Sequence, residues 1–118
     1  MPQLIDTIKL RNKREVYELD SGYRVDQVDS HGEKHQRRIP DRVADFCAEQ
    51  FSGQEVTVPE AKKILQPHAE RLGLPYTYGH KLKFYAQSVL LALVATGRAT
   101  MRKEGNQYHY AVQQSVLN

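Results

Sequence analysis

The feature that most constrains the fold is an apolar helix that runs directly into a β-hairpin. Residues 79 or 80 to 96 have helical periodicity, and Gly97 supplies a stop. Two segments that read as strands follow, 98–102 and 107–112, joined by the turn Lys103-Glu104-Gly105-Asn106. We therefore expect a long helix followed by two antiparallel strands. The inward face of the helix carries Leu82, Ala86, Val89, Leu90 and Leu93.

Two further helices are predicted upstream. The first begins at Ile39-Pro40, where a proline suits a first turn, and Ser52-Gly53 ends it. Its apolar face carries Ile39, Val43, Phe46, Cys47 and Phe51. A short extended stretch, 55–58, leads into the second helix, and Thr57-Val58-Pro59-Glu60 has the form of a capping box. Pro67 must kink or restart that helix near Gln66, because its ring clashes with the carbonyl four residues back. The buried face of the second helix carries Val58, Ala61, Ile64 and Leu65.

The N-terminal region reads as strands. Residues 15–19 and 23–28 are rich in Val and Tyr, and Asp20-Ser21-Gly22 between them is suited to a turn, which predicts a β-hairpin. Leu4, Ile5, Ile8 and Leu10 form either a third strand or a short helix, and their periodicity leaves both open. Residues 31–38 read as a polar, basic connector. We expect an N-terminal hairpin and connector over 1–38 and a helical domain over 39–118, together one compact unit.

Length and composition predict a single globular domain. The chain has 118 residues, of which 40% are hydrophobic and 26% charged. Its longest apolar run is the seven residues Val89–Ala95, whereas a membrane span needs about 18. The first residues lack the pattern of a secretory signal, and one cysteine cannot form an internal disulfide. We expect a cytoplasmic protein with no membrane partner.

Charge is distributed unevenly along the chain. The net charge is only +3, but residues 76–118 hold five Lys or Arg and a single acid, Glu104. Residues 41–75 hold four basic and six acidic side chains. Such an asymmetry is expected when one face of a protein meets a polyanion.

The stretch from Val89 to Thr100 resembles the end of the recognition helix in winged helix-turn-helix proteins of the small prokaryotic DNA-binding type. A Leu-x-x-Leu pair is followed by a glycine and then by the first wing strand, and the resemblance covers about residues 39–112. It implies an α+β winged-helix fold, with three helices and a C-terminal β-hairpin wing, to which an N-terminal β-hairpin is added. Residues 58–96 are some ten longer than the usual helix pair. Either Pro67 kinks one long helix or a short helix forms over 68–72. We prefer the 79–96 helix as the recognition helix, the one that contacts base edges.

The resemblance implies sequence-specific binding of double-stranded DNA, in a small transcriptional or mobile-element regulator. A helix fits the major groove, where Gln87 is suited to adenine and Lys83 to guanine or phosphate. Basic residues of the hairpin and connector are suited to phosphate. The candidate DNA-binding residues are Tyr76, Thr77, Tyr78, His80, Lys81, Lys83, Phe84, Gln87, Ser88, Arg98, Arg102, Lys103, Asn106 and Gln107, with Lys34, Arg37 and Arg38 of the connector.

A second function class stays open, in which the same fold docks onto a protein partner through Val89–Ala95 and the N-terminal hairpin. The helix is apolar on more than one side there, so either the N-terminal strands or a second chain must cover it. We expect a homodimer on this ground.

Catalysis and cofactor binding find little support in the sequence. His31, Glu33 and His35 are spaced as metal ligands on an extended segment, with Asp26 and Asp29 nearby, but Gly32 predicts a turn that scatters them. No nucleophile or phosphate-loop motif occurs. We expect no metal, no cofactor and no enzymatic activity. Cys47 is expected to be a packing residue, and at least one of Tyr108 and Tyr110 to lie in the core.

Overall fold

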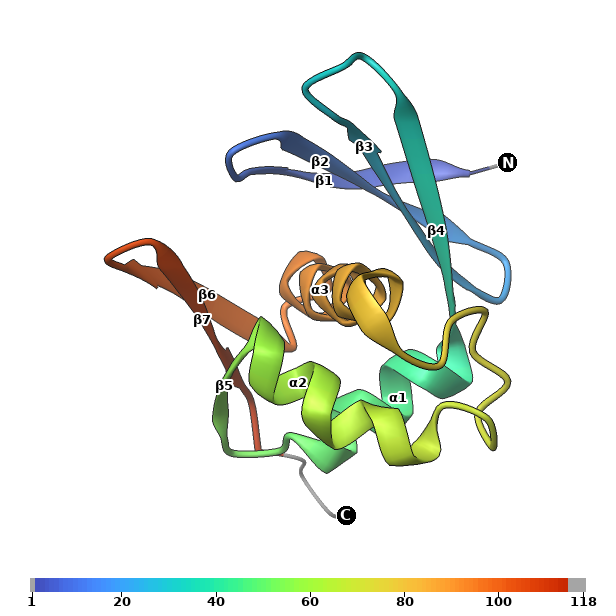
Figure 1. Cartoon of the computed structure of the whole chain (residues 1–118), viewed down its shortest axis with the longest axis vertical. Helices are drawn as coiled ribbons and strands as arrows, with labels where there is room; N and C mark the ends of the chain where they lie inside the picture. The colour runs from blue at the N-terminus through green and yellow to red at the C-terminus, as the bar shows by residue number, and fades with distance from the viewer. Residues whose placement is uncertain (1, 115–118) are drawn as a thin grey trace.

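The N-terminal third forms a four-stranded antiparallel sheet. The computed structural model describes residues 2–114, so the last four residues of the predicted helical domain lie outside it. Neighbouring strands follow chain order (Figure 1). The predicted hairpin is confirmed, and the ambiguous first segment is a strand. The strands are β1 (Gln3–Lys9), β2 (Lys13–Leu19), β3 (Gly22–Val28) and β4 (Lys34–Pro40).

The predicted connector is wrong, because residues 34–40 form strand β4. Arg37 pairs with Val25 and Ile39 with Tyr23 along the whole of β3. His35, Arg37 and Ile39 point inward, whereas Lys34 and the other intervening residues are exposed. Two of the three inward side chains are polar, so the segment lacks the alternation of apolar and polar residues by which a half-buried strand is predicted.

The second part of the chain contains three α-helices and a three-stranded antiparallel sheet in the described residues. The helices lie where the sequence predicts them, and β7 pairs with both β5 and β6. Pro67 ends α2 in a single 3₁₀ turn, and no separate helix covers 68–72. The elements are α1 (Asp41–Gln50), β5 (Glu55–Thr57), α2 (Val58–Leu65), η1 (Gln66–His68), α3 (Gly79–Ala95), β6 (Ala99–Glu104) and β7 (Gln107–Val112).

Local signals explain where these elements begin and end. Thr57 caps α2 through the expected capping box: its hydroxyl accepts from the Glu60 N–H, and the Glu60 carboxylate accepts from the Thr57 N–H. Gly97 follows α3 with φ 76°, a left-handed conformation that glycine adopts without strain. The β6–β7 strands pair from Glu104 and Gln107 outward, so two residues make the turn.

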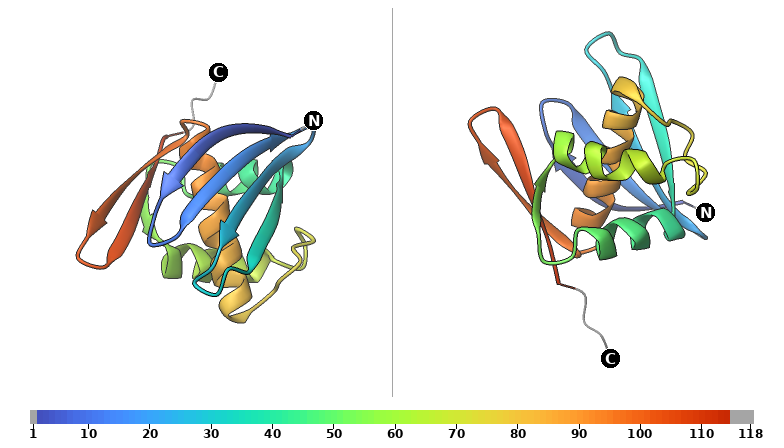
Figure 2. Two further views of the ribbon diagram at one scale, coloured as in Figure 1. Left: turned by 90° about the horizontal axis from the view of Figure 1, so that it is seen from above. Right: turned by 60° about the horizontal axis from the view of Figure 1, so that its bottom comes forward.

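Helix α3 is the centre of the molecule. The N-terminal sheet covers one side of it, and α1 and α2 cover another (Figures 1 and 2). Val89, Leu90, Leu91, Ala92 and Leu93 are all buried. The protein's own strands therefore cover the over-wide apolar face. This removes the apolar-surface argument for a homodimer. The predicted docking surface is wrong at residues 89–93, because these side chains lie inside the core.

One hydrophobic core joins the two parts of the chain. It contains Val16 and Val25 from the sheet together with Cys47 and Leu90 from the helices. Tyr110 is completely buried, which confirms that one of the two tyrosines lies in the core, and Cys47 is buried as expected. None of the helices described in residues 2–114 is long and apolar enough to cross a membrane.

Candidate functional site

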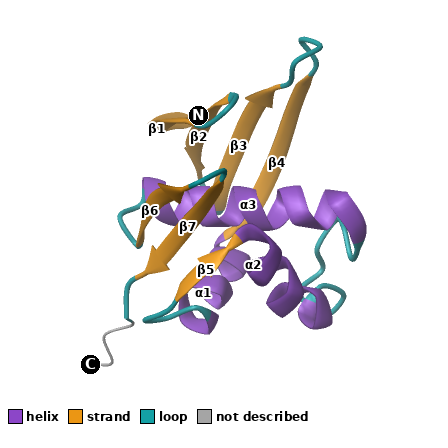
Figure 3. Cartoon of the chain, turned by 60° about the vertical axis from the view of Figure 1, so that its left-hand side comes forward, coloured by secondary structure: helices purple, strands orange, loops and turns teal. Residues whose placement is uncertain are grey.

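A groove runs between the start of α2, the exposed side of α3 and the β6–β7 turn. Its volume is about 480 Å³. Helix α3 contributes Lys83 and Gln87, and the hairpin contributes Asn106 and Gln107, so four predicted DNA-binding residues meet here. Figure 3 shows the hairpin projecting beside α3. Val58, Pro59, Glu104 and Tyr108 complete the lining.

Helix α2 extends the groove with cations that are not among the predicted DNA-binding residues. A neighbouring hollow of about 380 Å³ shares Pro59 and Lys83 and is also lined by Lys62, Lys63 and Gln66. Lys62 and Lys63 lie beside the buried face of α2, which carries Ala61 and Leu65. Their position outside the apolar stripe is visible in the sequence, but nothing in the sequence indicates that they lie near Lys83.

The β1–β2 turn approaches the same groove. The Arg14 guanidinium donates to Gln87 Oε1 over 3.4 Å, which joins the start of β2 to the wall of the groove. Figures 1 and 3 show the β1–β2 and β6–β7 turns on the same side of α3. Lys9, Arg11 and Lys13 are exposed at the β1–β2 turn. The predicted DNA-binding residues do not include this cluster, although the four cations within residues 9–14 are a usable signal.

The groove cations are not neutralised by the protein. No acid of the described residues forms an ion pair with Lys62, Lys63 or Lys83. Lys103 is not part of the groove lining, and its Nζ stands 5.7 Å from the centre of the Tyr108 ring, a cation–π contact. The single carboxylate in the groove lining is Glu104, and it is engaged elsewhere. The groove therefore has an excess of positive charge available to a ligand.

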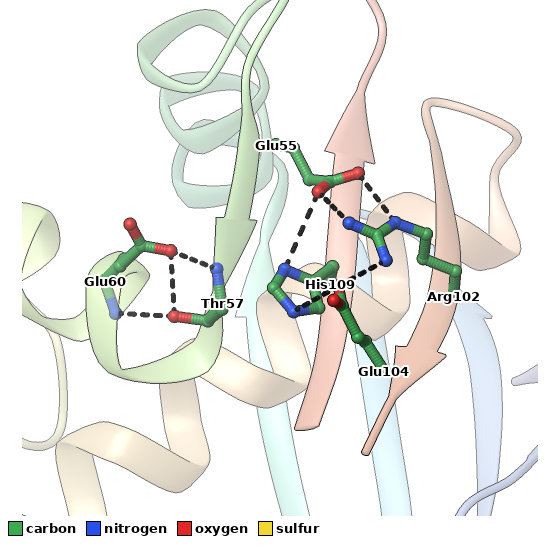
Figure 4. Close-up of polar contacts among 6 residues, drawn as sticks. All are labelled: Glu55, Thr57, Glu60, Arg102, Glu104 and His109. Atoms are coloured by element: carbon green, nitrogen blue, oxygen red, sulfur yellow. Dashed lines mark hydrogen bonds and ion pairs between the residues drawn. The ribbon is translucent and has the colours of Figure 1, made fainter. Parts of the chain in front are cut away.

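An ion-pair network on the β5–β7–β6 sheet engages that carboxylate (Figure 4). Arg102 contacts Glu55 at 2.6 Å and Glu104 at 2.8 Å, and His109 lies 3.6 Å and 3.7 Å from the same two carboxylates. Hydrogen bonds from Arg102 hold the pKa of Glu55 and of Glu104 below the ordinary value, and the two carboxylates raise the pKa of Arg102. Arg102 is thus already paired with acids.

Three further predicted residues have positions that bear on DNA contact. Arg98 donates to Asp45 at 2.9 Å, so its charge is also paired inside the protein. Ser88 is buried, and its hydroxyl donates to the Phe84 carbonyl, so its assignment as a contact is wrong: that side of α3 packs into the core. Lys34 lies on the outer face of the sheet, 3.8 Å from Asp26.

The remaining predicted residues gather in other places. Arg37, Tyr76, Lys81 and Phe84 line a separate cavity between β3, β4 and the first turns of α3. A further hollow, before and at the start of α3, is lined by Tyr76, Thr77, Tyr78, His80 and Lys81. Arg38 is exposed on β4. The structure therefore divides the predicted list over at least three surfaces.

The candidate metal ligands are partly brought together. Asp29, Glu33 and His35 place ligand atoms within 4.8 Å of one another, whereas His31 is not among them. The expected scattering is thus wrong for Glu33 and His35, because the β3–β4 turn brings them to Asp29. The Asp29 carboxylate accepts from the N–H groups of His31 and Glu33, each at 2.9 Å, and lies 2.9 Å from His35 Nε2. These contacts stabilise the β3–β4 turn, and this role explains why the three side chains lie together.

Comparison with known proteins gives no relative: no family model, no curated protein and no solved structure matches the chain. Function therefore has to be inferred from the groove and its charges.

Proposed function

We propose that this protein binds double-stranded DNA through the groove between α2, α3 and the β6–β7 turn, as a winged-helix protein. The resemblance implies three helices followed by a β-hairpin, and the order α1, α2, α3, β6, β7 supports this proposal. The short strand β5 lies between α1 and α2 and pairs with β7. In this proposal β6 and β7 form the wing, and the N-terminal sheet is an added layer that packs against α3.

The observation that carries the proposal is the set of unpaired cations around one groove. Lys62, Lys63 and Lys83 come from two helices, and no acid of the described chain pairs with them. Cations that contact phosphates release condensed counterions, which is the main source of affinity for nucleic acid. Unpaired lysines from separate elements are what a phosphate backbone requires.

Base contacts are assigned to the amide side chains of the same groove. Gln87 on α3 and Asn106 and Gln107 at the wing turn carry both donors and acceptors, which can bond base edges. Most of α3 is buried, so the helix meets DNA along one side near Lys83 and Gln87. The wing and α2 then carry most of the contact surface.

We further propose that the protein is a small transcriptional or mobile-element regulator and that it binds DNA as a homodimer. A single groove makes few phosphate contacts, and small regulators reach tight, specific binding by pairing two copies on two half-sites.

The test is a fluorescence-polarisation titration of a labelled mixed-sequence duplex of about 20 base pairs, at two salt concentrations. We expect affinity to fall steeply with salt. Lys83→Glu should weaken binding about tenfold or more and lower the salt slope by about one. Lys62→Glu combined with Lys63→Glu should weaken it further.

The matched control is Lys81→Glu, which makes the same charge change on the same helix. Lys81 lines a different cavity, so this variant should keep most of the affinity. Binding that ignores salt, or an equal loss for Lys81→Glu and Lys83→Glu, would refute the proposal.

A further inference from the structure

A second cavity lies on a different side of α3 from the groove. It has a volume of about 360 Å³ and sits between β3, β4 and the first turns of α3. Arg37 and His35 from β4 line it, as do Lys81 and Phe84 from α3. The size falls within the range of pockets for small ligands. Neither Lys83 nor Gln87 contributes to it.

Arg37 is the unusual residue of this cavity. Its side chain is half-buried, and burial lowers its pKa. It donates to the neutral amide of Gln27 at 3.3 Å, and its guanidinium carbon stands 5.4 Å from the centre of the Phe84 ring. No carboxylate of the described residues pairs with it. A guanidinium taken out of water without a counter-charge is costly, and an anion bound beside it removes that cost.

A second cation and two aromatic rings face the same space. Lys81 Nζ lies 5.8 Å from the centre of the Tyr76 ring and has no ion pair with an acid of the described chain. Phe84 is 39% exposed although it is a large apolar side chain, so its ring is accessible from the cavity. Cations beside accessible aromatic rings match a ligand that carries both a phosphate and a planar ring.

The cavity contains one carboxylate, Asp29, which is already engaged. One of its oxygens accepts two backbone N–H groups, and the other contacts His35 Nε2. The hydrogen bond from His35 and those from the backbone lower the pKa of Asp29. Asp29 is thus held at the β3–β4 turn, and Arg37 and Lys81 remain without an acid partner.

We propose that this cavity binds a mononucleotide, with its phosphate at Arg37 and Lys81 and its base against Phe84 and Tyr76. The proposal is independent of DNA binding, since it uses a different side of α3. A phosphate accepts charge-assisted hydrogen bonds from a guanidinium in fixed geometry, and the ammonium adds a point charge. Stacking on an aromatic ring accepts any base, so the chemistry selects nucleotides as a class.

The test is calorimetric titration of the full chain at low salt with AMP, adenosine and inorganic phosphate as separate probes. We expect saturable binding of AMP, and binding at least about tenfold weaker for adenosine and for phosphate, because each supplies half of the contacts. Lys81→Gln and Phe84→Ala should each weaken AMP binding about tenfold. Arg37→Met should abolish it while the melting temperature stays the same or rises, which excludes loss of folding as the cause.

Lys83→Glu is the control, and its affinity for AMP should equal that of the wild type. No saturable AMP binding, equal affinity for AMP and phosphate, or equal affinity for AMP and adenosine would overturn the proposal. So would undiminished AMP binding by folded Arg37→Met. The DNA titration of the groove uses other residues and another ligand. A failure to bind AMP is therefore distinguishable from a failure to bind DNA.

Discussion

Arg14 on β2 donates a hydrogen bond to Gln87 on α3, 73 residues further along the chain, and this contact ties the N-terminal sheet to the groove. The Arg14 side chain also donates to the Asn12 carbonyl at 2.5 Å, and the residue is only 6% exposed. Both acceptors are neutral. Burial lowers the pKa of Arg14, and the charge of Arg37 lowers it further. The two arginines place uncompensated positive charge between the sheet and α3.

The first prediction follows from that missing counter-charge. Arg14→Met keeps a long side chain at the position and removes the desolvated charge, so the free energy of unfolding should stay unchanged or rise by about 1 kcal/mol. Urea unfolding followed by circular dichroism measures it. Arg11→Met, at an exposed position of the β1–β2 turn, is the control and should change the free energy of unfolding little. A loss of about 2 kcal/mol or more for Arg14→Met would mean that its two hydrogen bonds outweigh the desolvation.

The second prediction concerns the hydroxyl of Tyr110. This residue is completely buried, and its hydroxyl has no hydrogen-bond partner within the described part of the chain. Burial raises its pKa to about 12. Tyr110→Phe removes an unsatisfied polar atom and keeps the ring, so the melting temperature should stay the same or increase. Tyr85→Phe is the contrasting variant, because the Tyr85 hydroxyl donates to the Arg38 carbonyl at 2.9 Å, and its loss should lower the melting temperature. Equal decreases in both variants would show that Tyr110 has a partner in solution.

The helices were predictable because their signals are local. Periodic apolar residues, the Thr57–Glu60 capping box and the glycine after α3 each act within a few residues, and the structure confirms them. Strand β4 was not predictable in the same way. Its inward side chains include Arg37 and His35, and only pairing with β3 makes that segment a strand.

The groove was predictable in part for a similar reason. Lys83, Gln87 and Asn106 follow from placing a helix before a hairpin, and they do line one groove. Which side of α3 is covered depends on how the N-terminal sheet packs, and no local pattern shows this. The sequence therefore predicts Ser88 as a contact although it is buried, and it does not indicate Lys62.

The third prediction is that the melting temperature falls at acidic pH and that part of this fall depends on Arg102. The pKa of Glu55 and that of Glu104 are lowered in the folded protein, first by hydrogen bonds from Arg102. A carboxyl group with a lowered pKa stabilises the fold above its ordinary pKa of 4.5, and this contribution is lost as the pH falls through the folded value. The melting temperature should therefore fall below about pH 4.5, and Arg102→Met should show a smaller fall.

Arg11→Met is again the control, and its pH dependence should match that of the wild type. Glu60, whose pKa is lowered by hydrogen bonds from Thr57, leaves some acid sensitivity in every variant. Parallel curves for the wild type and Arg102→Met from pH 7 to pH 2 would contradict the role of Arg102.

The fourth prediction is that Cys47 does not react with thiol reagents in the native state. The side chain lies on the inward face of α1 with no exposed surface, and burial raises its pKa to about 12. Only the thiolate attacks such reagents, so both access and ionisation are suppressed. At pH 8, labelling with a chromogenic disulfide should be undetectable in buffer and complete in concentrated urea. Its rate at intermediate urea should follow the unfolded fraction measured by circular dichroism. Rapid labelling in buffer would show that α1 separates from the core in the native state.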